Sequence, residues 1–185
     1  MKLSEIFNQE KLSLSFEVFP PKTDTAFESV KHATEEIAKL KPSFMSVTYG
    51  AGGGTSRYTL EITKNIKEHY GVPTLAHLTC VSSTKQTVHE KIEQMRLAGI
   101  KNVMALRGDL TPELENSDRS KWAYRHAVDL VRELKEADAD FCIGGACYQG
   151  LDSYTAGAEN LLCRTQTEVH VHKVEGGCRE KERVF

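Results

Sequence analysis

The sequence predicts an α/β fold built on a parallel sheet, and three observations support this. Apolar, strand-like segments begin near residues 12, 43, 74, 101 and 141. Amphipathic helical patterns lie between them, and each strand-like segment ends at or next to a polar or ionisable residue. Regular alternation of strands and helices at this spacing is typical of crossover connections, which make neighbouring strands parallel.

Two architectures share this alternation, the doubly wound sheet and the (βα)8 barrel. The first strand runs into Pro20, Pro21 and Lys22, not into the G-x-G-x-x-G turn of a dinucleotide-binding sheet. The polar residues at the five strand ends are Glu17, Thr48 with Tyr49, His77 with Thr79, Arg107 with Asp109, and Tyr148. Because a (βα)8 barrel assembles its active site at the C-terminal ends of its strands, we predict a fold of the TIM-barrel family.

The first βα unit is predicted from a period-two strand followed by a helical repeat. Residues 12–19 (LSLSFEVF) alternate until the two prolines, which cannot continue a paired strand. Thr25 and Glu28 have the spacing of a capping box, which predicts the start of the helix. The apolar stripe of that helix runs to about residue 40 through Phe27, Val30, Ala33, Ile37 and Leu40.

The next two units repeat this plan, with strands over residues 43–49 and 74–80. One helix face after the second strand carries Tyr58, Ile62, Ile66 and Tyr70, and one face after the third carries Val88, Ile92, Met95 and Ala98. Gly71 and Gly99 follow these helices directly. Glycine in this place is typical of a helix C-terminus.

The last two strands are expected over residues 102–106 and 141–147. Between them a helix is predicted over residues 122–134, with an apolar face of Ala123, Ala127, Leu130, Val131 and Leu134.

The length sets a limit on the barrel. A (βα)8 barrel typically needs about 250 residues, whereas 185 residues hold about five βα units. We therefore expect residues 1–148 to form the N-terminal part of a barrel with an exposed sheet edge. We expect residues 149–185 to form a divergent tail, poorly ordered or weakly strand-like.

Composition argues against several classes of protein. The 24 Lys and Arg residues nearly balance the 26 Asp and Glu residues and are scattered, which argues against a nucleic-acid or anionic-membrane partner. No apolar run approaches the roughly 18–20 residues of a membrane-spanning helix, and the first residues lack a secretory h-region. Five irregularly spaced cysteines do not resemble a disulfide framework. We expect a cytoplasmic protein.

Glu17 is a candidate catalytic acid because it interrupts an apolar strand between Phe16 and Val18. A carboxyl buried in a barrel mouth is a usable general acid. The alternation leaves a second possibility open, in which Glu17 points outward together with Ser13 and Ser15.

Three other segments have both a functional and a structural interpretation. Residues 107–109 (Arg-Gly-Asp) place a carboxylate at a strand end beside a glycine that admits a ligand, or form a surface turn. Residues 50–54 present backbone N–H groups to a phosphate or a flat ring, or form an ordinary flexible loop. His77 is either a site residue or a core histidine with its hydrogen bonds satisfied.

The cysteines and later histidines do not predict a metal site. Two thiols and two imidazoles lie close in sequence, but their spacing matches no paired-ligand zinc pattern; they are Cys163, His170, His172 and Cys178. Cys80, Cys142 and Cys147 lie in apolar strands and are interpreted as small buried hydrophobic residues.

Four strand-end segments together resemble the methylenetetrahydrofolate reductases. They are residues 16–22 (FEVFPPK), 46–51 (SVTYGA), 76–80 (AHLTC) and 105–109 (ALRGD), in the order and spacing of that family. The resemblance covers about residues 10–148 and includes residues 144–148 (GGACY).

The resemblance implies a (βα)8 barrel that binds FAD at the C-terminal ends of its strands. In that family NAD(P)H reduces the flavin, which passes a hydride to 5,10-methylenetetrahydrofolate and gives 5-methyltetrahydrofolate for methionine supply. Glu17 matches the acid that protonates the folate as its five-membered ring opens. Asp109 matches a carboxylate beside the flavin, where negative charge disfavours the anionic reduced ring. The positions matching flavin or nicotinamide contacts are Thr48, Tyr49, Ala51, His77, Arg107, Gly108, Asp109, Ala127 and Tyr148.

The sequence departs from the family pattern after Tyr148. A Pro-Glu-x-His-like segment is expected there, and residues 149–155 (QGLDSYT) stand in its place. The later strands, which carry further folate contacts, are not among the 185 residues. Two alternatives to an active reductase therefore stay open: a truncated, catalytically inactive fragment of that enzyme, and another (βα)8 enzyme. A complete barrel could also form a homo-oligomer.

Overall fold

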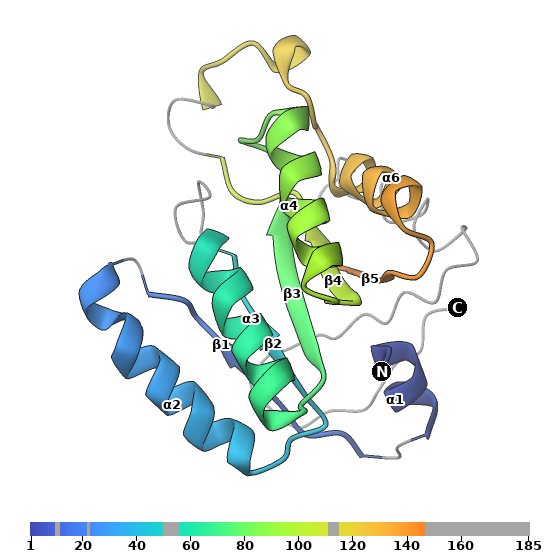
Figure 1. The fold of residues 1–185 in the computed structure, drawn as a ribbon. Coiled ribbons are helices and arrows are strands. Elements are labelled where there is room, and N and C mark those ends of the chain that lie inside the picture. The colour runs from blue at the N-terminus through green and yellow to red at the C-terminus, as the bar shows by residue number, and fades with distance from the viewer. Residues whose placement is uncertain (10–11, 22, 50–55, 111–114, 147–185) are drawn as a thin grey trace.

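A computed structural model describes residues 1–9, 12–21, 23–49, 56–110 and 115–146 of the chain (Figure 1). Its sheet contains five parallel strands that lie side by side in chain order. They are β1 (Ser15–Val18), β2 (Phe44–Val47), β3 (Thr74–Thr79), β4 (Asn102–Leu106) and β5 (Cys142–Gly145). A doubly wound sheet reverses its strand order part-way, whereas this order is that of consecutive barrel strands. The predicted fold class is therefore confirmed, as part of a (βα)8 arrangement.

The helices that connect the strands cover one face of this sheet, as the ribbon in Figure 1 shows. They are α2 (Phe27–Lys39), α3 (Ser56–Tyr70), α4 (Lys85–Leu97) and α6 (Ala127–Ala137). The strands contribute alternate apolar residues to this side, among them Met45, Val47, Ala76, Leu78 and Val103, all nearly inaccessible to solvent. Burial of this apolar surface provides most of the driving force for folding.

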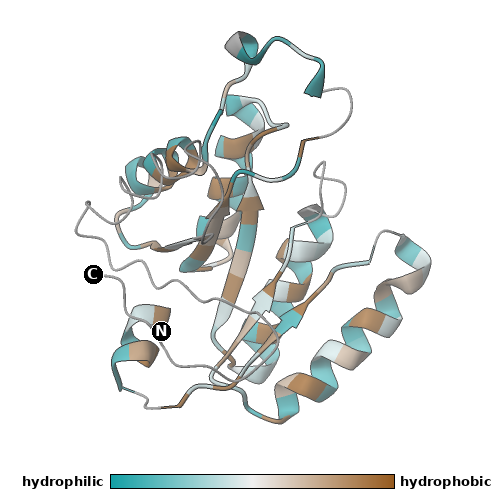
Figure 2. Cartoon of the chain, turned by 180° about the vertical axis from the view of Figure 1, so that it is seen from behind, coloured by the Kyte–Doolittle hydropathy of each residue, from teal (hydrophilic) through white to brown (hydrophobic). Residues whose placement is uncertain are grey.

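The short helix α1 (Leu3–Gln9) lies against the opposite face, which Figure 2 shows from behind. Leu3 and Ile6 form a separate apolar cluster with Phe44 and Leu75, and the ring of Phe7 meets that of Phe44 edge to face at 5.6 Å. These strand residues lie toward the N-terminal ends of their strands. Helix α1 therefore closes the base of the face that would form the inside of a barrel.

Helix ends were predicted correctly where a glycine follows the helix. Gly71 has φ of 65° and follows α3 directly, and Gly99 has φ of 62° and follows Ala98, the C-cap of α4. This left-handed conformation ends a helix at little cost for glycine.

Two predicted starts of helices were wrong. The chain enters α2 through a 3-10 turn (Asp24–Ala26), so Ala26 is the N-cap and Thr25 pairs with Thr23 through its hydroxyl at 3.0 Å instead of forming a capping box. Helix α6 begins at Ala127 and not at residue 122. The Asp129 carboxylate accepts hydrogen bonds of 3.1 Å from the backbone N–H groups before it, at residues 125 and 126, which fixes this later start.

The outer strands are shorter than predicted. Residues 12–14 precede β1, and the side chains of Leu12 and Leu14 are 85% and 59% exposed. Strand β5 ends at Gly145, and Cys147 and the predicted tail, residues 149–185, lie outside the described residues. Helix α1 was not predicted, because seven residues are too few to show a helical period. Across the described parts of the chain, no helix combines the length and the apolar character needed to cross a membrane.

Candidate active site

The face opposite the four helices is apolar at its base and polar toward the C-terminal ends of the strands. Glu17 of β1 pairs in register with Ser46 of β2, and Ser46 pairs with Leu75 of β3. Paired residues of parallel strands, and residues two apart along a strand, lie on the same face of a sheet. Glu17, Ser46 and His77 therefore lie on one face, above the cluster that α1 closes.

His77 lies close to both of the other side chains. Its Nε2 is 2.8 Å from Ser46 Oγ, a hydrogen bond, and 3.9 Å from Glu17 Oε1, which is too long for one. Only 12% of the His77 side chain is exposed. Burial lowers the pKa of His77 to about 4, so the imidazole is neutral at pH 7. His77 is thus a largely buried histidine that also borders the candidate site.

Glu17 and Ser15 lie on the same face of β1, as one of the two predictions for Glu17 expected. That prediction also had this face pointing outward, whereas it is the inner face of the sheet, on the side of α1. Ser15 pairs with Phe44, which lies in the cluster with α1. The Glu17 side chain is 46% exposed, so the burial expected for it is not found among the described residues. The carboxyl is open to a ligand and to solvent.

Thr48 connects three elements at the end of β2. Its backbone N–H donates to the Val18 carbonyl at 2.9 Å, and its carbonyl accepts from Thr59 Oγ1 at 2.8 Å. These contacts hold the ends of β1 and β2 against the first turn of α3. Tyr49 follows and packs, partly buried, against the apolar cluster that contains Leu78 and Val103. Ala51 and residues 50–54 lie outside the described residues.

The loop after β4 is fixed to the end of β3. The Arg107 carbonyl accepts hydrogen bonds from the N–H groups of Cys80 at 3.2 Å and Val81 at 2.9 Å. Gly108 has φ of 87°, and a Cβ on it would lie 2.9 Å from Thr79 Cβ. The positive φ and the Thr79 side chain both favour glycine at this position. The ligand access that the sequence suggested for Gly108 stays a prediction. The side chains of Arg107 and Asp109 are exposed.

Cys80 connects this loop with the start of α6. Its Sγ lies 3.6 Å from the Leu106 carbonyl oxygen and 3.8 Å from that of His126, which places Ala127 beside the ends of β3 and β4. Burial raises the pKa of Cys80 to about 12. The thiol is therefore un-ionised at neutral pH and serves in packing, as predicted, because the nucleophilic form of cysteine is the thiolate.

The structure brings Glu17 and His77 into proximity and places Thr48, Arg107, Gly108, Asp109 and Ala127 along the same edge. Tyr148 lies outside the described residues. Ser46 was not among the predicted site residues. The available signal in the sequence was its position two residues before Thr48, because residues two apart along a strand share a face. In the part of the chain that the structure describes, no three His, Cys, Asp or Glu side chains are grouped to hold a metal; Cys163, His170, His172 and Cys178 are not described.

Comparison with known proteins decides the family. A profile of the methylenetetrahydrofolate reductases matches residues 2–179. The chain belongs to this family. The match extends beyond residues 10–148, on which the resemblance was based.

Curated relatives agree with this membership. A 5,10-methylenetetrahydrofolate reductase of Pectobacterium carotovorum is 35% identical over 91% of this chain and 53% of its own length. One of Salmonella typhimurium is 37% identical over 87% and 52%. Methylenetetrahydrofolate reductase 2 of Schizosaccharomyces pombe is 36% identical over 72% of this chain and 21% of its own length. The chain thus spans about half the length of the bacterial relatives.

A solved structure confirms the fold alone. The 4-hydroxy-tetrahydrodipicolinate synthase of Methylacidiphilum fumariolicum aligns with a TM-score of 0.57 over 90% of this chain and 55% of its own. Their sequence identity is 11%, so this likeness carries no argument about the reaction.

Proposed function

We propose that this chain carries part of a methylenetetrahydrofolate reductase site, for the FAD-dependent reduction of 5,10-methylenetetrahydrofolate to 5-methyltetrahydrofolate by NAD(P)H. The convergence of Glu17, Ser46 and His77 on the inner face of the sheet supports the proposal most directly. It places an open carboxyl beside a neutral imidazole at the edge where barrel enzymes act.

The side chains at this edge fit a flavin by their chemistry. Thr48, Tyr49 and His77 offer hydroxyl and imidazole groups, and Arg107 offers an exposed guanidinium. Such groups can hydrogen-bond the polar edge of a flavin ring or its phosphates. We assign them to FAD binding together with Ala51, Gly108, Asp109, Ala127 and Tyr148. Bound FAD supplies the hydride acceptor for NAD(P)H and the hydride donor for the folate.

Glu17 is assigned the proton transfer. Its carboxyl gives a proton to the ring nitrogen that leaves as the five-membered ring of the folate opens, and the electron pair of the broken C–N bond stays on that nitrogen. The remaining iminium carbon is then open to hydride. Two features suit Glu17 to this role: the side chain reaches solvent, and the neutral His77 offers it no positive charge.

Asp109 is assigned the carboxylate beside the flavin. It is exposed, and it follows the loop that Arg107 and Gly108 fix on the end of β3. A negative charge there disfavours a second negative charge on the reduced cofactor.

The irregular spacing of the cysteines supports a cytoplasmic setting.

The test separates the two half-reactions. The purified chain, with FAD added, is scanned for flavin absorbance and assayed for NADH oxidation with a quinone acceptor and for folate reduction. Glu17→Gln is expected to lower folate reduction by about 100-fold or more while NADH–quinone turnover is retained. Ser15→Ala, on the same face of β1, is the matched control. Equal loss of both half-reactions in Glu17→Gln would refute the assigned role.

A second candidate is an inactive part of the same enzyme. The chain spans 53% and 52% of the two bacterial relatives, and among the described strands β1 and β5 each pair on one side. A colourless chain that is inactive with added FAD would support this candidate. A soluble monomer with a cooperative thermal transition would count against it.

A further inference from the structure

Ser46 occupies the centre of the polar group on the inner face. It is 9% exposed, its register partner on β1 is Glu17, and its hydroxyl lies 2.8 Å from Nε2 of His77 on β3. The three residues therefore form one polar layer across three neighbouring strands.

The geometry differs from that of a serine nucleophile. In a Ser–His–acid triad the serine and the acid lie on opposite ring nitrogens, so that the acid orients the base that activates the serine. Here Ser46 and Glu17 both face Nε2, at 2.8 Å and 3.9 Å. The Ser46 hydroxyl thus makes the hydrogen bond with Nε2, the ring nitrogen that also faces Glu17.

We propose that Ser46 is a positioning residue whose Oγ–H donates to Nε2 of His77, fixes the Nδ1–H tautomer and keeps the ring neutral beside Glu17. A neutral imidazole in the Nδ1–H form has an acceptor at Nε2, which matches the hydroxyl as donor. In the neutral Nε2–H tautomer this nitrogen would instead donate to the Ser46 oxygen, and a second proton on the ring would make it a cation.

The surroundings of His77 favour the neutral ring. The register partner on β4 is Met104, an apolar side chain, and the neighbour from β2 is Ser46. Glu17 of β1 is the charged group that faces the ring within the described strands. Burial lowers the pKa of His77 to about 4, which agrees with a ring that accepts a hydrogen bond and carries no charge.

The consequence for catalysis rests on the proposed function. An imidazolium at 3.9 Å would form an ion pair with Glu17 and hold the carboxyl against the ring. By holding His77 neutral, Ser46 leaves Glu17 able to act as the acid. The hydrogen bond itself does not depend on the reaction and can be tested without turnover.

The experiment is nitrogen NMR of the histidine rings in the full 185-residue chain, without flavin or folate. The His77 signals are identified by their loss in His77→Gln. In the unsubstituted chain we expect the Nδ1–H tautomer and a ring that stays neutral to about pH 5. In Ser46→Ala the ring stays buried but loses the donor that stabilises its neutral form, so we expect the pKa of His77 to rise by about one unit toward its ordinary value near 6.5. Ser46→Thr, which keeps the hydroxyl, restores the original titration, and Ser15→Ala leaves it unchanged.

Two results would overturn the proposal. One is the Nε2–H tautomer in the unsubstituted chain, which needs no variant to fold. The other is a His77 titration that is the same in Ser46→Ala and Ser46→Thr. Because the NMR measurement needs no cofactor, a chain that fails to reduce folate would count against the proposed function and leave this result standing.

Discussion

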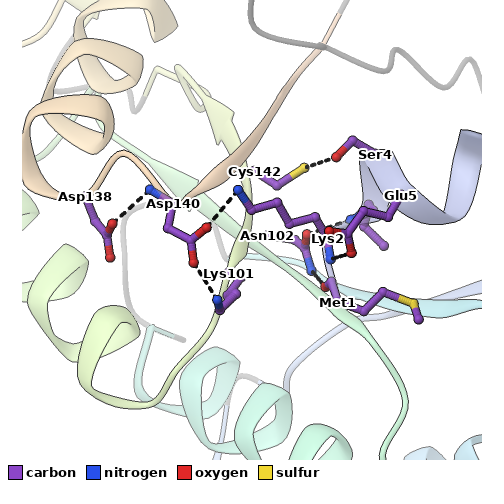
Figure 3. A network of polar contacts seen from close by, with 10 residues as sticks. Met1, Lys2, Ser4, Glu5, Lys101, Asn102, Asp138, Asp140 and Cys142 are labelled. Carbon is purple, nitrogen blue, oxygen red and sulfur yellow. Dashed lines mark hydrogen bonds and ion pairs between the residues drawn. The ribbon is translucent and has the colours of Figure 1, made fainter.

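The side-chain oxygen of Asn102, at the start of β4, accepts a hydrogen bond of 2.8 Å from the backbone N–H of Leu3, at the start of α1. The amide nitrogen of Asn102 donates to the Thr74 carbonyl at 3.0 Å and to the Met1 carbonyl at 3.3 Å, and Figure 3 shows Asn102 beside Met1. Asn102 is 3% exposed, so these bonds are shielded from water. They hold α1 across the base of the inner face and leave the opposite, polar end open to ligands.

Asn102→Ala is expected to destabilise the fold by about 2–3 kcal/mol, because it leaves the buried Leu3 N–H and a Thr74 carbonyl lone pair without their partner. Urea unfolding measures the change. Asn8→Ala, at an exposed position of α1, is the matched control and should change stability by less than about 0.5 kcal/mol. Equal effects of the two substitutions would show that Asn102 does not anchor α1.

Local sequence patterns predicted the strands, their order and the ends of two helices, because alternation and C-terminal glycines act over a few residues. They did not predict the anchoring of α1, which depends on Asn102, 99 residues away from Leu3. The capping box at Thr25 was wrong because the chain formed a 3-10 turn there. The Ser46–His77 contact joins two strands, so neither segment reveals it alone.

Gly108→Ala is expected to be more disruptive than a typical substitution at positive φ. At φ of 87° the alanine is strained, and its Cβ would lie 2.9 Å from Thr79 Cβ. Gly71→Ala is the matched control, because Gly71 has φ of 65° with no heavy atom within 4 Å of the added Cβ. We expect Gly71→Ala to cost about 1 kcal/mol and Gly108→Ala about 1–3 kcal/mol more. Comparable unfolding free energies would mean that the Thr79 contact relaxes freely.

Asp140 connects α1 to the loop before β4 through Lys2, at 2.8 Å, and Lys101 (Figure 3). Hydrogen bonds from Lys101 and Lys2 lower the pKa of Asp140 to about 2. A lowered pKa in the folded state stabilises the fold above the ordinary value of 3.8, and this contribution is lost as the pH falls toward 2. Asp140→Asn should therefore lower Tm by about 1–2 °C at pH 7.

The same difference should shrink as the pH falls below 3.8 and vanish only below pH 2, where the Asp140 carboxyl of the folded chain is protonated as well. Glu136→Gln, which removes an exposed carboxylate on α6, is the control for a change in net charge. A Tm difference for Asp140→Asn that stays constant from pH 7 to pH 2 would contradict the lowered pKa.

His77 changes stability with pH in the same direction as Asp140, because its pKa is also lowered in the folded chain. Below pH 6.5 the unfolded chain takes up a proton on this ring, whereas the folded chain does so only near pH 4. Since the unfolded state then binds more protons, stability falls as the pH drops from 6.5 to 4. A shift from 6.5 to about 4 corresponds to roughly 3 kcal/mol over this interval.

His77→Gln removes this titration, so its stability should fall less between pH 6.5 and pH 4.5, by about 2 kcal/mol, than that of the unsubstituted chain. Urea unfolding at the two pH values measures the difference, and comparing slopes removes any constant cost of the substitution itself. His32→Gln, which also removes one imidazole but at an exposed position of α2, should keep the original slope. If both variants keep that slope, His77 accepts its proton as readily in the folded chain as in the unfolded one, and it could not serve as a neutral neighbour of Glu17.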